Sequence, residues 1–190
     1  DQVIRAGKDQ IVSCDSIAML KPLVVLAIGQ SNAGNHGGRY SGTLAPIYSI
    51  SEGNCILATD PLPGSTGNGN SIWLRVPRHF TQFEPNRLLV ISAMGIDATS
   101  IDDWTAENSP LAKRLANHVK SMASLGLAPQ LVLWQQGEAD AKLGTSEEAY
   151  GAGLDRLAKI LSRAQSSAPI VMARSTVCRS APNAQVRGAI

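Results

Sequence analysis

Residues 23–32 read LVVLAIGQSN, a continuous apolar run that ends in a turn led by Gly29. Such a run is typical of a strand covered on both faces, as in a parallel sheet. The turn places the Ser31 hydroxyl at the carboxyl end of this strand, the edge where open α/β sheets bind ligands. Its spacing, Gly-x-Ser-x-x-Gly, differs from that of the Gly-x-Ser-x-Gly nucleophile elbow and excludes that model. At this point Ser31 has two possible roles, as a nucleophile or as a purely structural serine in the turn.

Further apolar runs predict strands at 88–93, 130–134 and 170–173. Amphipathic stretches between them predict helices at 110–125, with Ser109 as N-cap, and at 147–165, after a capping-box pair formed by Thr145 and Glu148. Their buried faces are expected to consist of apolar residues at helical spacing, namely Leu111, Leu115, Val119, Met122, Leu154, Leu157 and Leu161.

Strand–helix–strand repeats require right-handed crossovers, so we expect an α/β fold. The specific prediction is a three-layer α/β/α sandwich with a mostly parallel, doubly wound sheet, in a single domain over residues 1–190. Residues 1–20 are expected to form an edge strand or a lead-in to the sheet. Residues 34–70, which are rich in Gly, Ser, Asn and Pro, are expected to form a long ordered loop near the carboxyl end of the first strand.

The composition limits the classes of partner. Hydrophobic residues are 44% and charged residues 17% of the chain, which argues against disorder. A net charge of +2 without a block of like charges excludes nucleic acid and membrane surfaces as expected partners. Cys14, Cys55 and Cys178 lack metal-ligand spacing, and a disulfide such as Cys14–Cys55 is one possibility. We expect a secreted or extracytoplasmic protein, although the composition alone distinguishes no compartment.

Polar segments follow the first three predicted strands: Ser31-Asn32, residues 94–101 and residues 134–140. The carboxyl ends of parallel strands share one edge, so these segments should converge in one crevice. There Ser31 supplies a nucleophile, while backbone N–H groups of the second segment and the side-chain amide of Gln136 supply hydrogen-bond donors. Donors aimed at one point form an oxyanion hole, so the arrangement suits acyl transfer.

These segments resemble the SGNH-hydrolase superfamily, specifically its sialate O-acetylesterase and carbohydrate esterase family 6 branch. Residues 29–32 match the Gly-Gln-Ser-Asn block, residues 134–140 are similar to the Trp-x-Gln-Gly-Glu-x-Asp block, and residues 99–104 are similar to the Thr-Ser-Ile-x-x-Trp part of the intervening block. The resemblance extends over about residues 22–178. It implies a flavodoxin-like sheet with Ser31 as nucleophile and Gln136 as oxyanion donor.

The activity implied by the resemblance is a serine esterase that removes O-acetyl groups from a carbohydrate through an acyl-serine intermediate, without a cofactor. In the second block Asp97-Ala98 stands where the family has Gly-Gly, and Gly95 is displaced. The oxyanion donor of that block is a backbone N–H, which we place near Gly95. Asn32 and Glu138 are the candidate substrate-binding residues, although bracing the turn or a loop explains them as well.

A serine nucleophile needs a base. The Asp-x-x-His block of the family does not occur in the sequence, whose histidines are His36, His79 and His118. We expect His118 to be structural, His79 to lie on the surface or in a loop, and His36 to contact substrate at most. The Asp–His pair is therefore expected outside these residues, in a missing carboxy-terminal segment or on a second chain.

Several other features have a structural as well as a functional interpretation. Trp73 and Trp104 are suited to stacking on a sugar but equally to packing in the core. No Gly-Lys-Ser/Thr follows the glycine-rich segments, so a phosphate loop is not predicted. No metal is assigned to the aspartates that follow the second strand, Asp97, Asp102 and Asp103. A catalytically silent carbohydrate-binding module is the main alternative function, and a nucleotide-binding α/β domain is a third.

Overall fold

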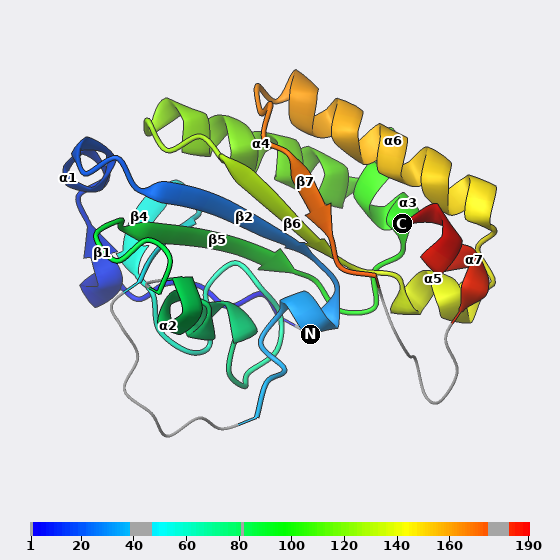
Figure 1. Ribbon diagram of the computed structural model, residues 1–190, viewed down its shortest axis with the longest axis horizontal. Coiled ribbons are helices and arrows are strands. Elements are labelled where there is room, and N and C mark those ends of the chain that lie inside the picture. Colours follow the sequence, from blue (N-terminus) through cyan, green and yellow to red (C-terminus); the bar gives the residue numbers. More distant parts are fainter. Residues whose placement is uncertain (1, 39–46, 81, 175–182) are drawn as a thin grey trace.

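One mixed sheet organises the chain. The computed structural model describes residues 2–38, 47–80, 82–174 and 183–190. The strand order is β1-β4-β3-β5-β2-β6-β7, and strands β3, β5, β2, β6 and β7 run parallel (Figure 1). The strands are β1 Ile11–Val12, β2 Leu23–Gly29, β3 Tyr48–Ser51, β4 Asn54–Leu57, β5 Leu89–Gly95, β6 Leu131–Gln135 and β7 Ile170–Met172. The predicted α/β class and the four predicted strands are confirmed, with boundaries that differ by one or two residues.

An antiparallel hairpin lies within the segment that was expected to be a loop. Strands β3 and β4 pair around a two-residue turn, Glu52 and Gly53, with φ of 49° and 78°. Positive φ at both central residues is the geometry of the type I′ turn, whose twist matches that of the flanking strands. The loop prediction is therefore wrong for residues 48–57. Strand β1 pairs antiparallel with β4, so the edge-strand prediction for residues 1–20 is confirmed there.

Helices cover both faces of the sheet. On one face lie α3 (Ile101–Thr105), α4 (Pro110–Ser124) and α6 (Glu147–Arg163); η3 (Ile72–Arg75) and α2 (Pro77–Phe80) lie on the other (Figure 1). The remaining helices are η1 Lys8–Gln10, α1 Cys14–Met19, η2 Ser31–Ala33, α5 Glu138–Leu143 and α7 Ala184–Ala189. None of the helices in the described ranges is long and apolar enough to cross a membrane.

The alternation of strand side chains divides the core in two. Val24, Leu26 and Ile28 of β2 pack with the α4 and α6 side, whereas Val25 and Ala27 pack with the η3 side. The residues predicted for the buried helix faces lie in the first of these cores, with Leu111 only partly buried. The continuous apolar run of β2 therefore reflects burial on both sides of the sheet.

The N-caps of the two long helices differ in how well they were predicted. Ser109 caps α4 as expected, because its hydroxyl accepts from the backbone N–H groups of Leu111 and Ala112. The cap of α6 is Ser146, whose hydroxyl accepts from Ala149 N–H, so the capping box with Thr145 is wrong. The Thr145 hydroxyl donates instead to the Asp140 carboxylate at 2.9 Å.

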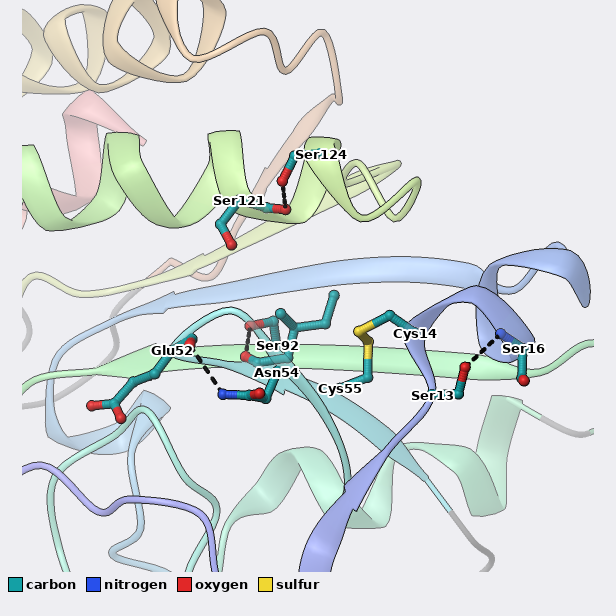
Figure 2. Close-up of a disulfide and its surroundings, with 10 residues drawn as sticks. Ser13, Cys14, Ser16, Glu52, Asn54, Cys55, Ser92, Ser121 and Ser124 are labelled. Atoms are coloured by element: carbon teal, nitrogen blue, oxygen red, sulfur yellow. Dashed lines mark hydrogen bonds between the residues drawn. A yellow bond between two sulfur atoms is a disulfide. The ribbon is translucent and has the colours of Figure 1, made fainter. Parts of the chain in front are cut away.

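A disulfide joins Cys14, at the start of α1, to Cys55 in β4 (Figure 2). Of the pairings that three cysteines allow, the structure thus contains the one offered as an example from the sequence. The Cα atoms are 5.2 Å apart, within the ordinary range for disulfides. The bond fastens the amino-terminal segment to the antiparallel side of the sheet. Cys178 lies outside the described residues.

Reduction of this disulfide is expected to lower the free energy of unfolding by about 3–4 kcal/mol, because the bond closes a loop with a sequence separation of 41. Thermal unfolding with and without a thiol reductant measures the effect. The reductant-dependent fall in Tm should persist in Cys178→Ser and vanish in Cys14→Ser/Cys55→Ser. An unchanged Tm on complete reduction would contradict the prediction.

Candidate active site

The three polar segments meet at one edge of the sheet, as predicted. Gly29 at the end of β2 lies beside Gly95 of β5 and Gln135 of β6. The contacts continue past the strands, because Ile96 N–H donates to Gly29 O at 2.9 Å and Gln30 N–H donates to Gln135 O at 3.1 Å. The segments after β2, β5 and β6 are thus hydrogen-bonded neighbours, although they lie far apart in the sequence.

Two glycines allow the segments to approach this closely. A Cβ on Gly29 would lie 1.9 Å from Gln135 O, and the φ of Gly29 is +145°. A Cβ on Gly95 would lie 2.3 Å from the backbone of Ala33 and Gly34. Both positions therefore exclude a side chain. The glycine before the Gln-Ser-Asn sequence is required by the packing of β2 against β6.

Ser31 is the first residue of η2 and is partly buried. Within the described part of the chain, neither its hydroxyl nor its N–H makes a hydrogen bond. Two hydrogen bonds hold the short helix. Trp73 Nε1–H donates to Ala33 O at 2.8 Å, and Gly34 N–H donates to Ser31 O at 2.8 Å. The Ser31 hydroxyl therefore lies on a fixed backbone and has no hydrogen-bond partner among the described residues.

Gln30 ties η2 to the segment after β6. Its side chain is buried, and its Oε1 accepts from Gly137 N–H at 3.4 Å and from Ala139 N–H at 3.1 Å. These N–H groups lie at the start of α5, where no earlier backbone carbonyl is available to them. Gln30 thus fixes the position of the first segment relative to the third.

Asn32 and Glu138 contact each other. Asn32 Nδ2–H donates to Glu138 Oε1 at 2.6 Å, and the Gln135 side-chain amide donates to the same oxygen at 3.2 Å. Two acceptor atoms of this group, Gln135 Oε1 and Glu138 Oε2, are buried and have no partner among the described residues. Gln135 was not selected from the sequence. The alternation of side chains in β6 could have identified it, because Trp134 faces the α6 side and its neighbour must face the opposite side.

Gln136, the predicted oxyanion donor, belongs to a buried polar network. Its side chain is 0% exposed; its amide donates to Thr99 O at 2.9 Å and to Asp140 Oδ2 at 2.5 Å. Its Oε1 accepts from the Tyr150 hydroxyl at 2.7 Å. Asp140 Oδ2 also accepts from Ile101 N–H at 2.8 Å, at the start of α3. The network joins the second and third segments, and an oxyanion role for Gln136 would require its amide to leave these partners.

Gly95, the other predicted oxyanion donor, is also engaged. Its N–H donates to Ser65 Oγ at 2.9 Å. The next two N–H groups of this segment also have partners. Ile96 N–H donates to Gly29 O, and Asp97 N–H donates to Thr66 Oγ1 at 3.0 Å. The structure therefore brings Gly95 to the site but directs its N–H into the supporting loop.

His36 forms a pair with Asp97 that the sequence did not reveal. His36 Nε2 lies 2.7 Å from Asp97 Oδ1, with the side chains 39% and 18% exposed. The two residues follow β2 and β5, so both lie at the same edge of the sheet as Ser31. They are separated by 61 residues, and only the convergence of the strands brings them together. Nothing in the sequence indicated this carboxylate partner, and substrate contact by His36 stays a prediction.

His118 of α4 has a structural role, as expected. The Ser92 hydroxyl donates its one proton to Ile50 O at 2.6 Å, so it accepts from His118 Nε2–H at 2.7 Å. Burial, with a smaller contribution from the charge of Arg114, lowers the pKa of His118 to about 4. His118 is therefore neutral near pH 7 and bonds β5 to α4.

Stability is expected to fall in acid because of His118. Its folded pKa lies below the ordinary value of 6.5, so its contribution is complete above about pH 6.5 and is lost as the pH falls toward 4. The loss amounts to at most about 3 kcal/mol, from about 1.4 kcal/mol per pKa unit. Urea unfolding across this range should show the slope in the exposed control His79→Gln and a reduced slope in His118→Gln. Equal slopes in both variants would contradict the prediction.

The other candidate residues have structural partners. Trp104 is fully buried and contacts Trp134 edge-on with ring centroids 5.6 Å apart, so neither ring is open to a sugar. Trp73 is also a core residue. Asp102 pairs with Arg156 at 2.6 Å, and Asp103 closes the capping box of α3. No group of three or more metal-ligating side chains occurs among the described residues.

The fold as a whole is similar to that of several solved structures. No protein-family model and no curated protein sequence matches the chain. A protein from Arabidopsis thaliana superposes with a TM-score of 0.71 at 23% identity, over 88% of this chain and 80% of that one. NanS superposes with a TM-score of 0.52 at 17% identity, over 78% and 66%. A carbohydrate acetylesterase from Xanthomonas citri gives 0.53 at 12% identity, over 87% of this chain and 46% of its own.

The chain shares the α/β fold of these proteins. In its sheet, β5 lies on one side of β2 and β6 lies on the other. In open α/β sheets, ligands bind beyond the carboxyl end of the strand at which the winding changes direction, and here that strand is β2. Ser31 lies directly after that strand. At these low sequence identities the likeness establishes the fold alone, because one fold can carry many different chemistries.

Proposed function

We propose that the protein is a serine esterase that removes acetyl groups from a carbohydrate. The observation that carries this proposal is the Ser31 hydroxyl, which makes no hydrogen bond to the described residues and lies at the carboxyl end of β2 on a fixed backbone. A carbohydrate acetylesterase is among the proteins that share the fold, which supports the esterase class. Acetylated carbohydrate is accordingly the proposed substrate.

The proposed reaction proceeds through an acyl-serine. Ser31 Oγ attacks the ester carbonyl carbon while a histidine takes its proton, and the carbonyl oxygen becomes an oxyanion. The intermediate collapses by breaking the ester bond, and the histidine gives the proton to the leaving sugar hydroxyl. Water then attacks the acetyl-serine in the same way, which releases acetate and restores Ser31.

The oxyanion donors in this proposal are N–H groups for which no hydrogen bond to the described residues is found. The Ser31 N–H is one, and the Gln135 amide, of which one N–H bonds Glu138, is the second. Gln136 and Gly95, the donors expected from the motif, would act only after giving up Asp140 and Ser65 as partners. We therefore assign these two residues to holding the segments in place.

The base in this proposal is an Asp–His pair of the kind that the motif implies, although the Asp-x-x-His block itself does not occur in residues 1–190. His36, held by Asp97 at the same edge, is proposed to contact the substrate. A secreted or extracytoplasmic location is part of the proposal, and the Cys14–Cys55 disulfide supports it because such bonds persist in oxidising compartments.

The experiment that tests the proposal uses the full-length protein, a chromogenic acetate ester and a serine-directed phosphonate. Hydrolysis together with phosphonate on the Ser31 peptide, located by mass spectrometry, supports it. Sugar binding without turnover or labelling supports the alternative, a catalytically silent carbohydrate-binding module. One observation favours that alternative, namely that no base is hydrogen-bonded to the Ser31 hydroxyl among the described residues.

A further inference from the structure

A basic groove lies between α4 and α6, beside the end of α3. It has a volume of about 410 Å³, and alanine side chains with the partly buried Ile160 form its apolar surface. Five cationic side chains line it: Lys113, Lys120, Arg156, Lys159 and Arg163. The carboxylate in its lining is Glu107. We refer to this feature as the α4–α6 groove.

The charge of the α4–α6 groove is locally uncompensated. The whole chain has a net charge of only +2, so the clustering of five cations is a local property. Arg156 pairs with Asp102 at 2.6 Å. Lys113, Lys120, Lys159 and Arg163 form no ion pair within the described ranges. Facing cations repel each other, and an anion between them would remove this cost.

The cations form two rows that run along the helices. Lys113 and Lys120 are seven residues apart on α4, and Lys159 and Arg163 are four apart on α6. These spacings place the members of each row on one helix face. Seven residues of helix rise about 10 Å. The groove is therefore suited to an extended ligand with several negative charges rather than to a single ion.

We propose that the α4–α6 groove binds an anionic glycan chain, one that carries carboxylate or sulfate groups. No aromatic side chain lines the groove, so it lacks the stacking surfaces on which single-stranded nucleic acids bind. The guanidinium of Arg163, which forms no ion pair with the described residues, is matched to carboxylate and sulfate oxygens. The glycan is the carrier of the acetyl groups, and in this respect the inference rests on the proposed function.

The position of the groove agrees with such a role. It begins at Thr105 and Glu107, at the end of α3, and α3 directly follows the polar segment after β5. Its other lining residues belong to α4 and α6 or directly follow α6. These two helices lie side by side over one face of the sheet (Figure 1). One end of the groove thus adjoins the helix that follows the polar segment after β5, and that segment shares the sheet edge with Ser31.

The test measures binding of an unacetylated polygalacturonate oligomer by calorimetry. The full-length wild type is compared with Lys120→Glu/Lys159→Glu, which reverses one unpaired cation in each row. We expect the Kd of the variant to rise by about tenfold or more, and the wild-type Kd to rise steeply between about 50 mM and about 200 mM salt. The matched control Lys8→Glu/Lys21→Glu makes the same charge change at exposed sites elsewhere and should bind as the wild type does.

Tm values and hydrolysis of a small soluble acetate ester show that the groove variant is folded, and both should equal those of the wild type. An unchanged Kd in the groove variant overturns the inference, as does equal binding of a neutral oligosaccharide or of a thymidine oligonucleotide of the same charge. Glycan binding through the groove by a protein without esterase activity would leave the groove site standing and overturn only the proposed function.

Discussion

Replacing Ser31 by alanine is expected to reduce acetate ester hydrolysis by at least about 10⁴-fold. The acyl-serine cannot form without this oxygen, and no other group at the site replaces it. Steady-state kinetics of the full-length protein on a chromogenic acetate ester measure the effect. Stability should change little, because the Ser31 hydroxyl makes no hydrogen bond to the described residues.

Ser124→Ala is the matched control for this loss. Ser124 lies exposed at the end of α4, and its hydroxyl donates only to Ser121 O at 2.8 Å (Figure 2). Its kcat/KM should equal that of the wild type. Hydrolysis that persists undiminished in Ser31→Ala would show that a different residue attacks the ester, and the acyl-serine mechanism would have to be abandoned.

Replacing Gly29 by alanine is expected to lower the free energy of unfolding by at least about 3 kcal/mol, through backbone strain and a steric clash. The added Cβ would lie 1.9 Å from Gln135 O, and this backbone atom cannot move aside without separating β2 from β6. The φ of +145° adds strain for any side chain. Urea unfolding monitored by tryptophan fluorescence measures the change.

Gly38→Ala provides the comparison for Gly29→Ala. A Cβ at Gly38 meets no described residue within 4 Å, so the substitution should leave stability unchanged or raise it slightly by restricting the unfolded chain. A Gly29→Ala protein as stable as Gly38→Ala would mean that the β2–β6 junction is looser than described.

Periodicity and capping revealed the parallel part of the fold in advance. Continuous apolar runs identified β2, β5, β6 and β7, because burial on both faces removes polar positions from a strand. The β3–β4 hairpin escaped prediction because Tyr48–Ser51 is short, half polar and joined by Glu52-Gly53 rather than by a strong turn pair. Short strands of this kind owe their pairing to tertiary contacts.

The sequence predicted which segments form the site, but not which side chains contact each other within it. The convergence of three segments followed from strand direction alone. The roles of Gln135 and Gln136 depend on which side of β6 each faces, and a shift of one residue inverts that assignment. The partnership of His36 with Asp97 depends on loops after two different strands. The register and loop paths that decide such contacts are properties of the assembled sheet.

The disulfide of Figure 2 also affects how molecules behave toward one another. Strand β1 is only two residues long, yet it occupies the outer hydrogen-bonding groups of β4. The Cys14–Cys55 disulfide holds β1 beside β4. Under reducing conditions β1 would detach, and β4 would become an open template for strands of neighbouring molecules. Oxidative folding therefore protects the protein against aggregation as well as against unfolding.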